Sequence, residues 1–448
     1  MIDLVHVHTD LGTIKGIASG NYEVFKGIPY AIPPIGEFRF KSALPYSRSL
    51  DGFEAVQFGD VPIQPPNHLE NFFNVRPQHY TQDEHCLTLN IWRPKQTTAT
   101  DRLPVIVYFY GGSFINGHSA LDMYNPASIT SQQRVIVVTL NYRLGALGFL
   151  DWSTFHPNWD NNLGLSDQLC ALQWLSNHIA NFGGNPQCIT AMGQSAGAMS
   201  VQALLLHPTS RKMIHRAILL SGALQWMRPQ EAQVKAQEFK SIKETLYPNI
   251  PWLALSAPQI LTLMKKLQAQ YGKSKGLEFL YAPIKTDSFE DDFSNVRVPV
   301  LISQTQAEGD IYIQSENRTL DPQQFQKVAR RTHVDVPHVN DIQTAQQQRN
   351  WITKHYFHRP IRTLTQTLSR YTKTWSATFA WCRPQHPHYA SSYHILDVPF
   401  WFGRLEILAA HGLTLTDYDC HLSQQMIQDV CTFAKTGKCA WTGIKHYQ

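Results

Sequence analysis

The sequence predicts an α/β fold with a mostly parallel central sheet that helices cover on both faces. Five short apolar runs, rich in Val, Ile or aromatic residues or close to turn signals, have the composition of buried strands: 105–110, 135–140, 189–192, 217–220 and 300–303. An amphipathic helix is predicted by apolar residues that recur every three or four positions: Leu165, Leu169, Leu172, Leu175 and Ile179. Buried strands that alternate with helices are typical of a parallel sheet.

Length and charge restrict the architecture and the partners of the chain. Its 448 residues would suggest two or three domains by length alone, but no low-complexity linker divides them, and we expect one domain over 1–448. The net charge of +5 is small for this size, and Lys and Arg are scattered, which argues against nucleic-acid or anionic-membrane partners. No apolar stretch approaches the length of a membrane span.

The remaining elements follow in chain order. The first sixty residues, with Gly- and Pro-rich turns, predict an antiparallel section. Segments 225–295 and 312–370 are expected to be helical cap or insert regions, since 231–270 is polar and helical in pattern with little strand signal. A late strand is predicted at 376–381 and a closing helix at 421–435.

Cysteine and histidine usage predicts neither a disulfide framework nor a metal site. The seven cysteines show no tight spacing: Cys86, Cys170, Cys188, Cys382, Cys420, Cys431 and Cys439. The N-terminus has no apolar core of signal-peptide length, so we expect a reducing cytoplasm. His386 and His388 lack a carboxylate or thiol at ligand spacing, so an ordinary loop is the preferred interpretation and no metal or cofactor is expected.

The segment Gly193-Gln194-Ser195-Ala196-Gly197 has the G-x-S-x-G pattern of a nucleophile elbow. A predicted strand at 188–192 precedes it, and a helix rich in Ala, Met and Leu is predicted at 196–206. A sharp strand-to-helix turn exposes the serine, and glycine tolerates the close backbone approach on either side. Ser195 is therefore the candidate nucleophile, and a serine hydroxyl needs a base and an acid that orients the base.

The order of motifs resembles the type-B carboxylesterases, the cholinesterase-like branch of the α/β-hydrolases, and in style the bacterial esterases of that group. The resemblance implies an α/β-hydrolase fold, and it is weak over 225–295 and 312–370. The segments that carry it are 25–31, 36–40, 86–92, 110–114, 141–145, 164–168, 181–186 and 221–222.

The resemblance implies a Ser-Glu-His triad in that chain order. The family's acid stands in a Glu-Gly step that Glu308 and Gly309 match, after the predicted strand 300–303. A solvated loop glutamate is the alternative interpretation of Glu308, and Asp310 is a competitor that the pattern disfavours. His394 matches the base in the family's H-x-x-[ED]-x-P-F-x-F-G segment.

The resemblance also implies an oxyanion hole. Gly111, Gly112 and Ser113 follow the predicted strand 105–110, and the donors carried over are the N–H groups of Gly112 and Ser113. The third is the N–H of Ala196, next to the nucleophile. Read in isolation, Gly111 and Gly112 are equally compatible with a plain glycine turn.

Other matches and departures refine the picture. Two ion pairs carried over from the family, Arg39 with Glu84 and Arg143 with Asp167, are interpreted as scaffold. Gln194 stands where many members have Glu, which should weaken stabilisation of an imidazolium and of cationic substrates. Ser113 replaces a third glycine and brings a side chain to the acyl region. The tryptophan that binds choline in cholinesterases has no counterpart before Cys86, which argues against a cholinesterase.

These patterns predict a serine carboxylesterase that hydrolyses small-molecule carboxylic esters through an acyl-enzyme on Ser195. An amidase or carbamate hydrolase would use the same triad and stays open. A non-catalytic binding homologue is the third reading, and the presence of all three triad members argues against it.

Overall fold

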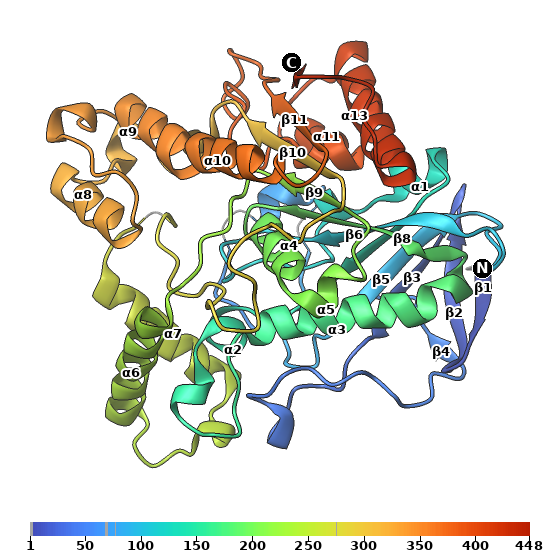
Figure 1. Ribbon diagram of the computed structural model, residues 1–448, viewed down its shortest axis with the longest axis horizontal. Helices are drawn as coiled ribbons and strands as arrows, with labels where there is room; N and C mark the ends of the chain where they lie inside the picture. The colour runs from blue at the N-terminus through green and yellow to red at the C-terminus, as the bar shows by residue number, and fades with distance from the viewer. Residues whose placement is uncertain (1–2, 68–69, 77, 275) are drawn as a thin grey trace.

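A twelve-stranded sheet runs through the computed structural model, which describes residues 3–67, 70–76, 78–274 and 276–448 (Figure 1). The strand order is β1-β2-β3-β5-β7-β6-β8-β9-β10-β11-β12, and β4 pairs with β2. The strands are β1 (Leu4–Thr9), β2 (Gly12–Ser19), β3 (Tyr22–Pro29), β4 (Phe53–Glu54), β5 (Thr88–Pro94), β6 (Leu103–Phe109), β7 (Ile136–Leu140), β8 (Gly184–Gln194), β9 (Arg216–Leu220), β10 (Val300–Thr305), β11 (Thr374–Phe379) and β12 (Ile444–Tyr447).

The sheet is antiparallel at its N-terminal side and parallel elsewhere. Strands β1, β2, β3, β5 and β7 pair antiparallel in succession. From β7 through β6 to β12 each neighbouring pair is parallel, so the carboxyl ends of β6, β8, β9 and β10 meet at one edge. The predicted α/β class, the mostly parallel sheet and the antiparallel N-terminal section are confirmed.

Helices cover both faces of this sheet (Figure 1). Along β6, Val105, Val107 and Phe109 belong to the core beneath α3, α4 and α10. Ile106 and Tyr108 belong to the opposite core, beneath α11 and α13. The helices are α1 (Ala127–Gln132), α2 (Gly145–Phe149), α3 (Leu163–His178), α4 (Ala196–Leu206), α5 (Pro208–Arg211), α6 (Pro229–Leu246), α7 (Ala257–Tyr271), α8 (Pro322–Arg331), α9 (Ala345–Ile352), α10 (Arg359–Leu368), α11 (Val398–Phe402), α12 (Glu406–Ala410) and α13 (Asp417–Thr436), with a π-helical turn η10 (Thr353–His358) before α10.

Within the expected insert regions, α6 to α9 lie beside the sheet, whereas α10 packs on one of its faces. α6 and α7 fall within 225–295 and pack against each other, and α8, α9 and α10 fall within 312–370. In Figure 1 the lobe of α8 and α9 projects at the upper left, with α6 and α7 below it. In the described part of the chain, no helix combines the length and apolarity that crossing a membrane requires.

Two ion pairs fasten loops to this framework. The Arg143 guanidinium contacts Asp167 on α3 at 2.6 Å, and both side chains are buried. Arg39 contacts Glu84 at 2.7 Å and also donates to the carbonyl oxygen of Leu255, 2.5 Å away in the first insert region. The two pairs predicted from the resemblance are therefore present, and Arg39 links segment 225–295 to the N-terminal part of the molecule.

Candidate active site

Ser195 occupies a strained turn between β8 and α4. Its φ of 54° and ψ of −122° lie outside the helical and strand regions that non-glycine residues prefer. A Cβ atom on Gly197 would lie 1.9 Å from the carbonyl oxygen of Phe109 at the end of β6, so glycine is needed for α4 to begin here. The Ser195 N–H donates to the carbonyl oxygen of Leu220 in β9 at 2.8 Å, which anchors the turn to the sheet.

His394 and Glu308 form a buried hydrogen-bonded pair near this turn. Glu308 is fully buried in a 3-10 turn (Glu308–Ile311) directly after β10, and its Oε2 lies 2.6 Å from Nδ1 of His394. The Thr305 N–H donates to Glu308 Oε1 at 2.7 Å. Burial opposes ionisation of Glu308, but the charge and hydrogen bond of His394 and the Thr305 N–H outweigh it, so the pKa of Glu308 lies below its usual value.

The other ring nitrogen of His394 points to the elbow. Its Nε2 atom lies 3.2 Å from Nε2 of Gln194, the residue before Ser195. Among the described residues no hydrogen bond joins Ser195 Oγ to His394. The structure thus brings Glu308, His394 and Gln194 into direct contact, and Ser195 directly follows Gln194 in the chain.

Three further residues around His394 were missed by the sequence analysis. The rings of Phe357 and Tyr312 lie 4.8 and 6.0 Å from the imidazole, centroid to centroid. Asp397 is fully buried, and its Oδ2 accepts a hydrogen bond from Trp401 Nε1 at 3.0 Å. Burial, reinforced by the nearby Glu308 carboxylate, raises the pKa of Asp397 to about 7. An acid three residues after the candidate base was the available signal for Asp397.

The loop after β6 lies against the elbow. A Cβ atom on Gly111 would be 3.0 Å from Cβ of Ser195, and one on Gly112, where φ is +119°, would be 2.0 Å from the carbonyl oxygen of Asn116. In the described part of the chain, the N–H groups of Gly112 and Ser113 have no protein acceptor. Ala196 is the first residue of α4, so its N–H has no acceptor within the helix. The N–H groups of Gly112, Ser113 and Ala196 therefore have no acceptor among the described residues, and the loop after β6 approaches Ser195 at Gly111.

Left-handed backbone conformations concentrate at these loops. Non-glycine residues with positive φ include Ser113 (55°), Phe114 (62°), Ser195 (54°), Ser221 (50°) and Ile395 (79°). The value for Ile395 is unusual because a β-branched side chain disfavours this region, and Ile395 directly follows His394. Strain of this kind persists where surrounding structure enforces it, and it gathers at functional sites.

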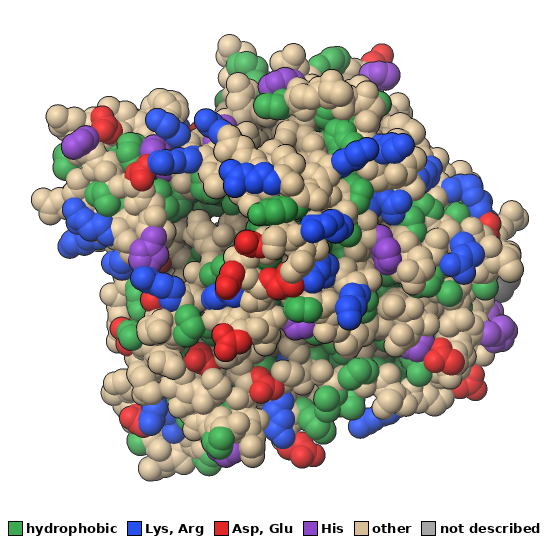
Figure 2. Space-filling model, in the orientation of Figure 1, with side chains coloured by type: hydrophobic (Ala, Val, Ile, Leu, Met, Phe, Trp, Pro, Cys, Tyr) green, Lys and Arg blue, Asp and Glu red, His purple; other side chains and the backbone are tan. Residues whose placement is uncertain are grey.

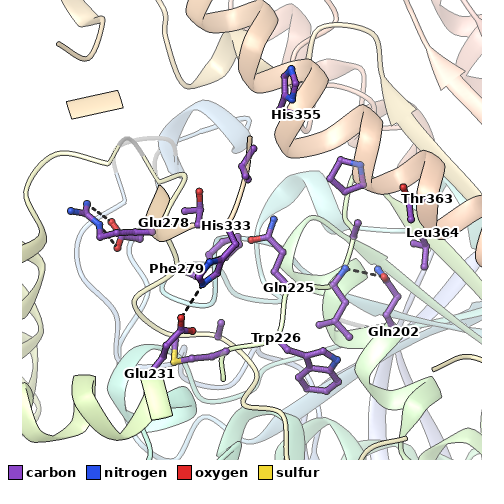
Figure 3. A pocket seen from close by; sticks show the side chains of 18 of the residues that line it. Gln202, Gln225, Trp226, Glu231, Glu278, Phe279, His333, His355, Thr363 and Leu364 are labelled. Carbon is purple, nitrogen blue, oxygen red and sulfur yellow. Dashed lines mark hydrogen bonds and ion pairs between the residues drawn. The ribbon is translucent and has the colours of Figure 1, made fainter. Parts of the chain in front are cut away.

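A cavity of about 980 Å³ opens beside the site, and Figure 2 shows the surface hollowed next to the lobe of α8 and α9. Its lining includes Ala223, which is two residues beyond Ser221, and the aromatic side chains of Trp226 and Phe279. Figure 3 shows His355, Thr363 and Leu364 above Trp226 and Gln202. The described lining residues do not include Ser195 or His394, so the cavity adjoins these residues through the loop after β9 rather than enclosing them.

Charged pairs line the part of this cavity formed by the insert regions. Arg331 on α8 contacts Glu278 at 2.6 Å, and His333 contacts Glu231 on α6 at 2.9 Å (Figure 3). These pairs join the two insert regions across the cavity. Phe279 lies 5.9 Å from Phe114, centroid to centroid, and so connects the cavity to the loop that holds Gly112 and Ser113.

Three aromatic residues near the site and the His386–His388 loop lie in different environments. Trp226 lines the cavity, whereas Phe114 and Trp401 are fully buried in the core. His386 stacks on Tyr389 with ring centroids 4.6 Å apart. Among the described residues, no group of three or more His, Cys, Asp or Glu side chains could hold a metal ion.

The fold and this site define a serine hydrolase of the α/β-hydrolase type, and the chain belongs to the carboxylesterase family. The sequence pattern of that family, described as "Carboxylesterase family", matches residues 3–270. The resemblance to bacterial-type carboxylesterases is confirmed, and the protein is a carboxylic ester hydrolase of the serine type.

Similar proteins include esterases along the whole chain. The para-nitrobenzyl esterase of Bacillus subtilis (strain 168) is 32% identical over 446 residues, which cover 96% of this chain and 90% of that protein. The solved structure of a thermophilic PNB esterase superposes with a TM-score of 0.88 at 27% identity, covering 100% of this chain and 97% of the other. A cholinesterase of Mus musculus is 41% identical over 226 residues, 48% of this chain and 37% of that protein.

Proposed function

We propose that Ser195, His394 and Glu308 are the catalytic triad with which this carboxylesterase hydrolyses small-molecule carboxylic esters. The observation that carries the proposal is the 2.6 Å contact between Glu308 and His394 Nδ1 beside the strained Ser195 turn. The ionised, buried Glu308 holds the proton on Nδ1, so that Nε2 carries the lone pair that acts as the base.

In the first half of the reaction, the Ser195 Oγ–H proton passes to His394 Nε2 while Oγ attacks the ester carbonyl carbon. The resulting tetrahedral oxyanion accepts hydrogen bonds from the N–H groups of Gly112, Ser113 and Ala196, which have no competing acceptor among the described residues. The protonated His394 then donates its proton to the departing alcohol, and an acyl-enzyme on Ser195 remains.

Water completes the cycle. His394 Nε2 takes a proton from a water molecule that attacks the acyl carbon, the same N–H groups stabilise the second oxyanion, and the proton returns to Ser195 Oγ as the acid leaves. Glu308 stabilises the imidazolium in both halves, because a buried carboxylate next to a forming positive charge needs no solvent rearrangement. The side chains named here account for every proton transfer.

Turnover of p-nitrophenyl butyrate by the protein and its Ser195→Ala variant tests the proposal. We expect Ser195→Ala to lower kcat by about 10⁴-fold or more with an unchanged melting temperature, since Oγ makes no hydrogen bond to His394 in the free protein. Ser200→Ala is the control, because Ser200 is a fully buried serine on α4, the helix that begins directly after Ser195. Near wild-type turnover in Ser195→Ala would exclude Ser195 as the nucleophile.

We propose further that segments 225–295 and 312–370 form a helical cap of one domain that spans 1–448. The cavity lined by both segments next to Ala223 supports this assignment. In this arrangement the cavity receives one of the two groups that flank the ester bond, with Trp226 and Phe279 as its apolar contacts.

A cytoplasmic location is part of the proposal. Cys86 and Cys431 are buried as free thiols, and burial raises the pKa of Cys431 to about 12, which keeps it unreactive. Free thiols of this kind suit a reducing compartment. Cell fractionation with an activity assay checks it, and activity confined to an exported fraction would contradict it.

A further inference from the structure

Gln194 has an unusual position for a buried amide. It is the last residue of β8, its side chain is inaccessible to solvent, and a Cβ atom on Gly111 would lie 2.6 Å from its Oε1 atom. Its Nε2 atom contacts His394 Nε2 at 3.2 Å, whereas Oε1 has no hydrogen-bond partner among the described residues. The one polar contact of the Gln194 amide that the structure describes is therefore with the candidate base.

This contact specifies a protonation state. An amide NH₂ group can only donate, so the His394 Nε2 atom that it faces must be the acceptor, with the ring neutral and its proton on Nδ1. On the opposite side, Nδ1 faces the Glu308 carboxylate at 2.6 Å, which can only accept. The two contacts thus select the same tautomer independently.

A hydrogen bond to the neutral form of a base disfavours its protonation. An imidazolium N–H at Nε2 would meet the donor N–H groups of Gln194, whereas a carboxylate of the same shape would accept from it. The other groups that face the ring are Glu308 from the turn after β10, Tyr312, and Asp397 on the segment of His394 itself. Phe357 from η10 is uncharged.

We propose that Gln194 is a positioning residue that keeps His394 Nε2 unprotonated and so sets the acid limit of ester hydrolysis by this protein. The inference rests on the proposed role of His394 as the base. With Gln194, the protein stays active at lower pH than it would with a carboxylate at position 194.

The test is the pH dependence of kcat/KM for p-nitrophenyl butyrate, whose acidic limb reports protonation of the base in the free enzyme. Gln194→Met removes the donor at similar length, and Gln194→Glu supplies an acceptor with a charge. We expect the midpoint of the limb to rise by about half a pH unit with Met and by about one unit or more with Glu. The midpoint of the acidic limb should therefore be lowest with Gln at position 194, higher with Met and highest with Glu.

Gln168→Met is the matched control. Gln168 is equally buried, its Nε2 donates to Ser200 Oγ at 3.1 Å, and its Oε1 also lacks a partner among the described residues. This variant loses a comparable amide without touching His394, so its limb should coincide with that of the wild type. Because Asp397 also titrates beside the ring, the three residues at position 194 are compared again in an Asp397→Asn background, where the order should persist.

A limb that stays in place in Gln194→Glu, or that moves to lower pH in either variant, overturns the proposal. A second readout does not depend on turnover: nitrogen-15 NMR of the His394 ring in Ser195→Ala, assigned by loss of the signal in His394→Gln. We expect an unprotonated Nε2 at neutral pH that becomes protonated at higher pH when Glu replaces Gln194. Full activity of Ser195→Ala would instead refute the triad itself, which separates the two failures.

Discussion

Asp397 is a buried acid whose ionisation opposes folding. Its pKa rises from the ordinary 3.8 to about 7 because it is buried next to the Glu308 carboxylate. Between these two values the unfolded chain releases a proton that the folded protein keeps, so stability falls as pH rises from about 4 to about 7. The shift corresponds to a loss on the order of 4 kcal/mol of the free energy of unfolding.

Asp397→Asn removes this loss, since an amide stays neutral and its oxygen can still accept from Trp401 Nε1. Urea unfolding at pH 5 and pH 8 should show a drop in the wild type that the variant lacks. Asp419→Asn is the control with the opposite sign: burial of Asp419 is outweighed by hydrogen bonds from Thr416 and Trp381 and by Arg383, which lower its pKa. Equal pH dependence in wild type and Asp397→Asn would contradict the assignment.

At the scale of single residues, the sequence indicates a candidate nucleophile more directly than candidates for its partners. Ser195 is recognisable because the glycines on either side of it are close in sequence. Glu308 and His394 are 86 residues apart and could be proposed only through the family resemblance. The roles of Gln194 and Asp397 depend on which buried atoms face each other, and that information is absent from local spacing.

The element that sets the site is the β8-to-α4 turn, and Gly197 is its closest contact. A Cβ atom there would lie 1.9 Å from the Phe109 carbonyl oxygen and 2.7 Å from that of Tyr110, both in backbone that cannot yield locally. We expect Gly197→Ala to displace the start of α4 from β6, to destabilise the protein by about 1–3 kcal/mol and to lower kcat/KM by about 100-fold.

The control for this prediction is Gly52→Ala. Gly52 has a φ of +75° but meets nothing within 4 Å, so only its backbone conformation is strained. Gly52→Ala should lower the free energy of unfolding by about 1 kcal/mol and leave kcat/KM unchanged. Thermal melts and p-nitrophenyl butyrate assays of both variants decide the matter, and equal activities would show that the close approach has no bearing on the site.

Elements with a strong apolar pattern were predicted well, and weakly patterned ones were not. The helix expected at 196–206 coincides with α4, and every residue of this helix is buried. Strand β12 was missed since Ile444 is 60% exposed and polar residues follow it at the edge of the sheet. The π-helical turn η10 gives no periodic signal, yet it supplies Phe357 to the His394 environment.

At the scale of the whole molecule, Arg39 ties an insert region to the sheet. It pairs with Glu84, whose side chain is 16% exposed, and donates to the Leu255 carbonyl oxygen. Arg39→Met should destabilise the protein by about 3–5 kcal/mol, because Glu84 is left without its cation, and should expose the segment around Leu255 to protease. Limited proteolysis and urea unfolding measure both effects.

Lys15→Met serves as the comparison, since the Lys15–Glu54 pair is 3.4 Å long and Glu54 is 65% exposed. Such a pair contributes about 0–1 kcal/mol. If Arg39→Met and Lys15→Met lowered the free energy of unfolding by similar amounts, Arg39 would have no special role in holding the segment around Leu255. The sequence could predict helices in 225–295 from their polar composition, but not this tie, which joins residues more than 200 positions apart.

The left-handed residues of the site come from loops after four strands that are distant in the chain: Ser113 after β6, Ser195 after β8, Ser221 after β9 and Ile395 beyond β11. Each conformation is unfavourable in isolation and is held by the completed sheet. A partly folded chain therefore lacks the Ser195 conformation that activity requires. The loss of activity on heating should coincide with global unfolding. The colour that colonies produce from a chromogenic ester would then report the amount of correctly folded protein. Such colonies could be screened for mutations that stabilise or destabilise the fold.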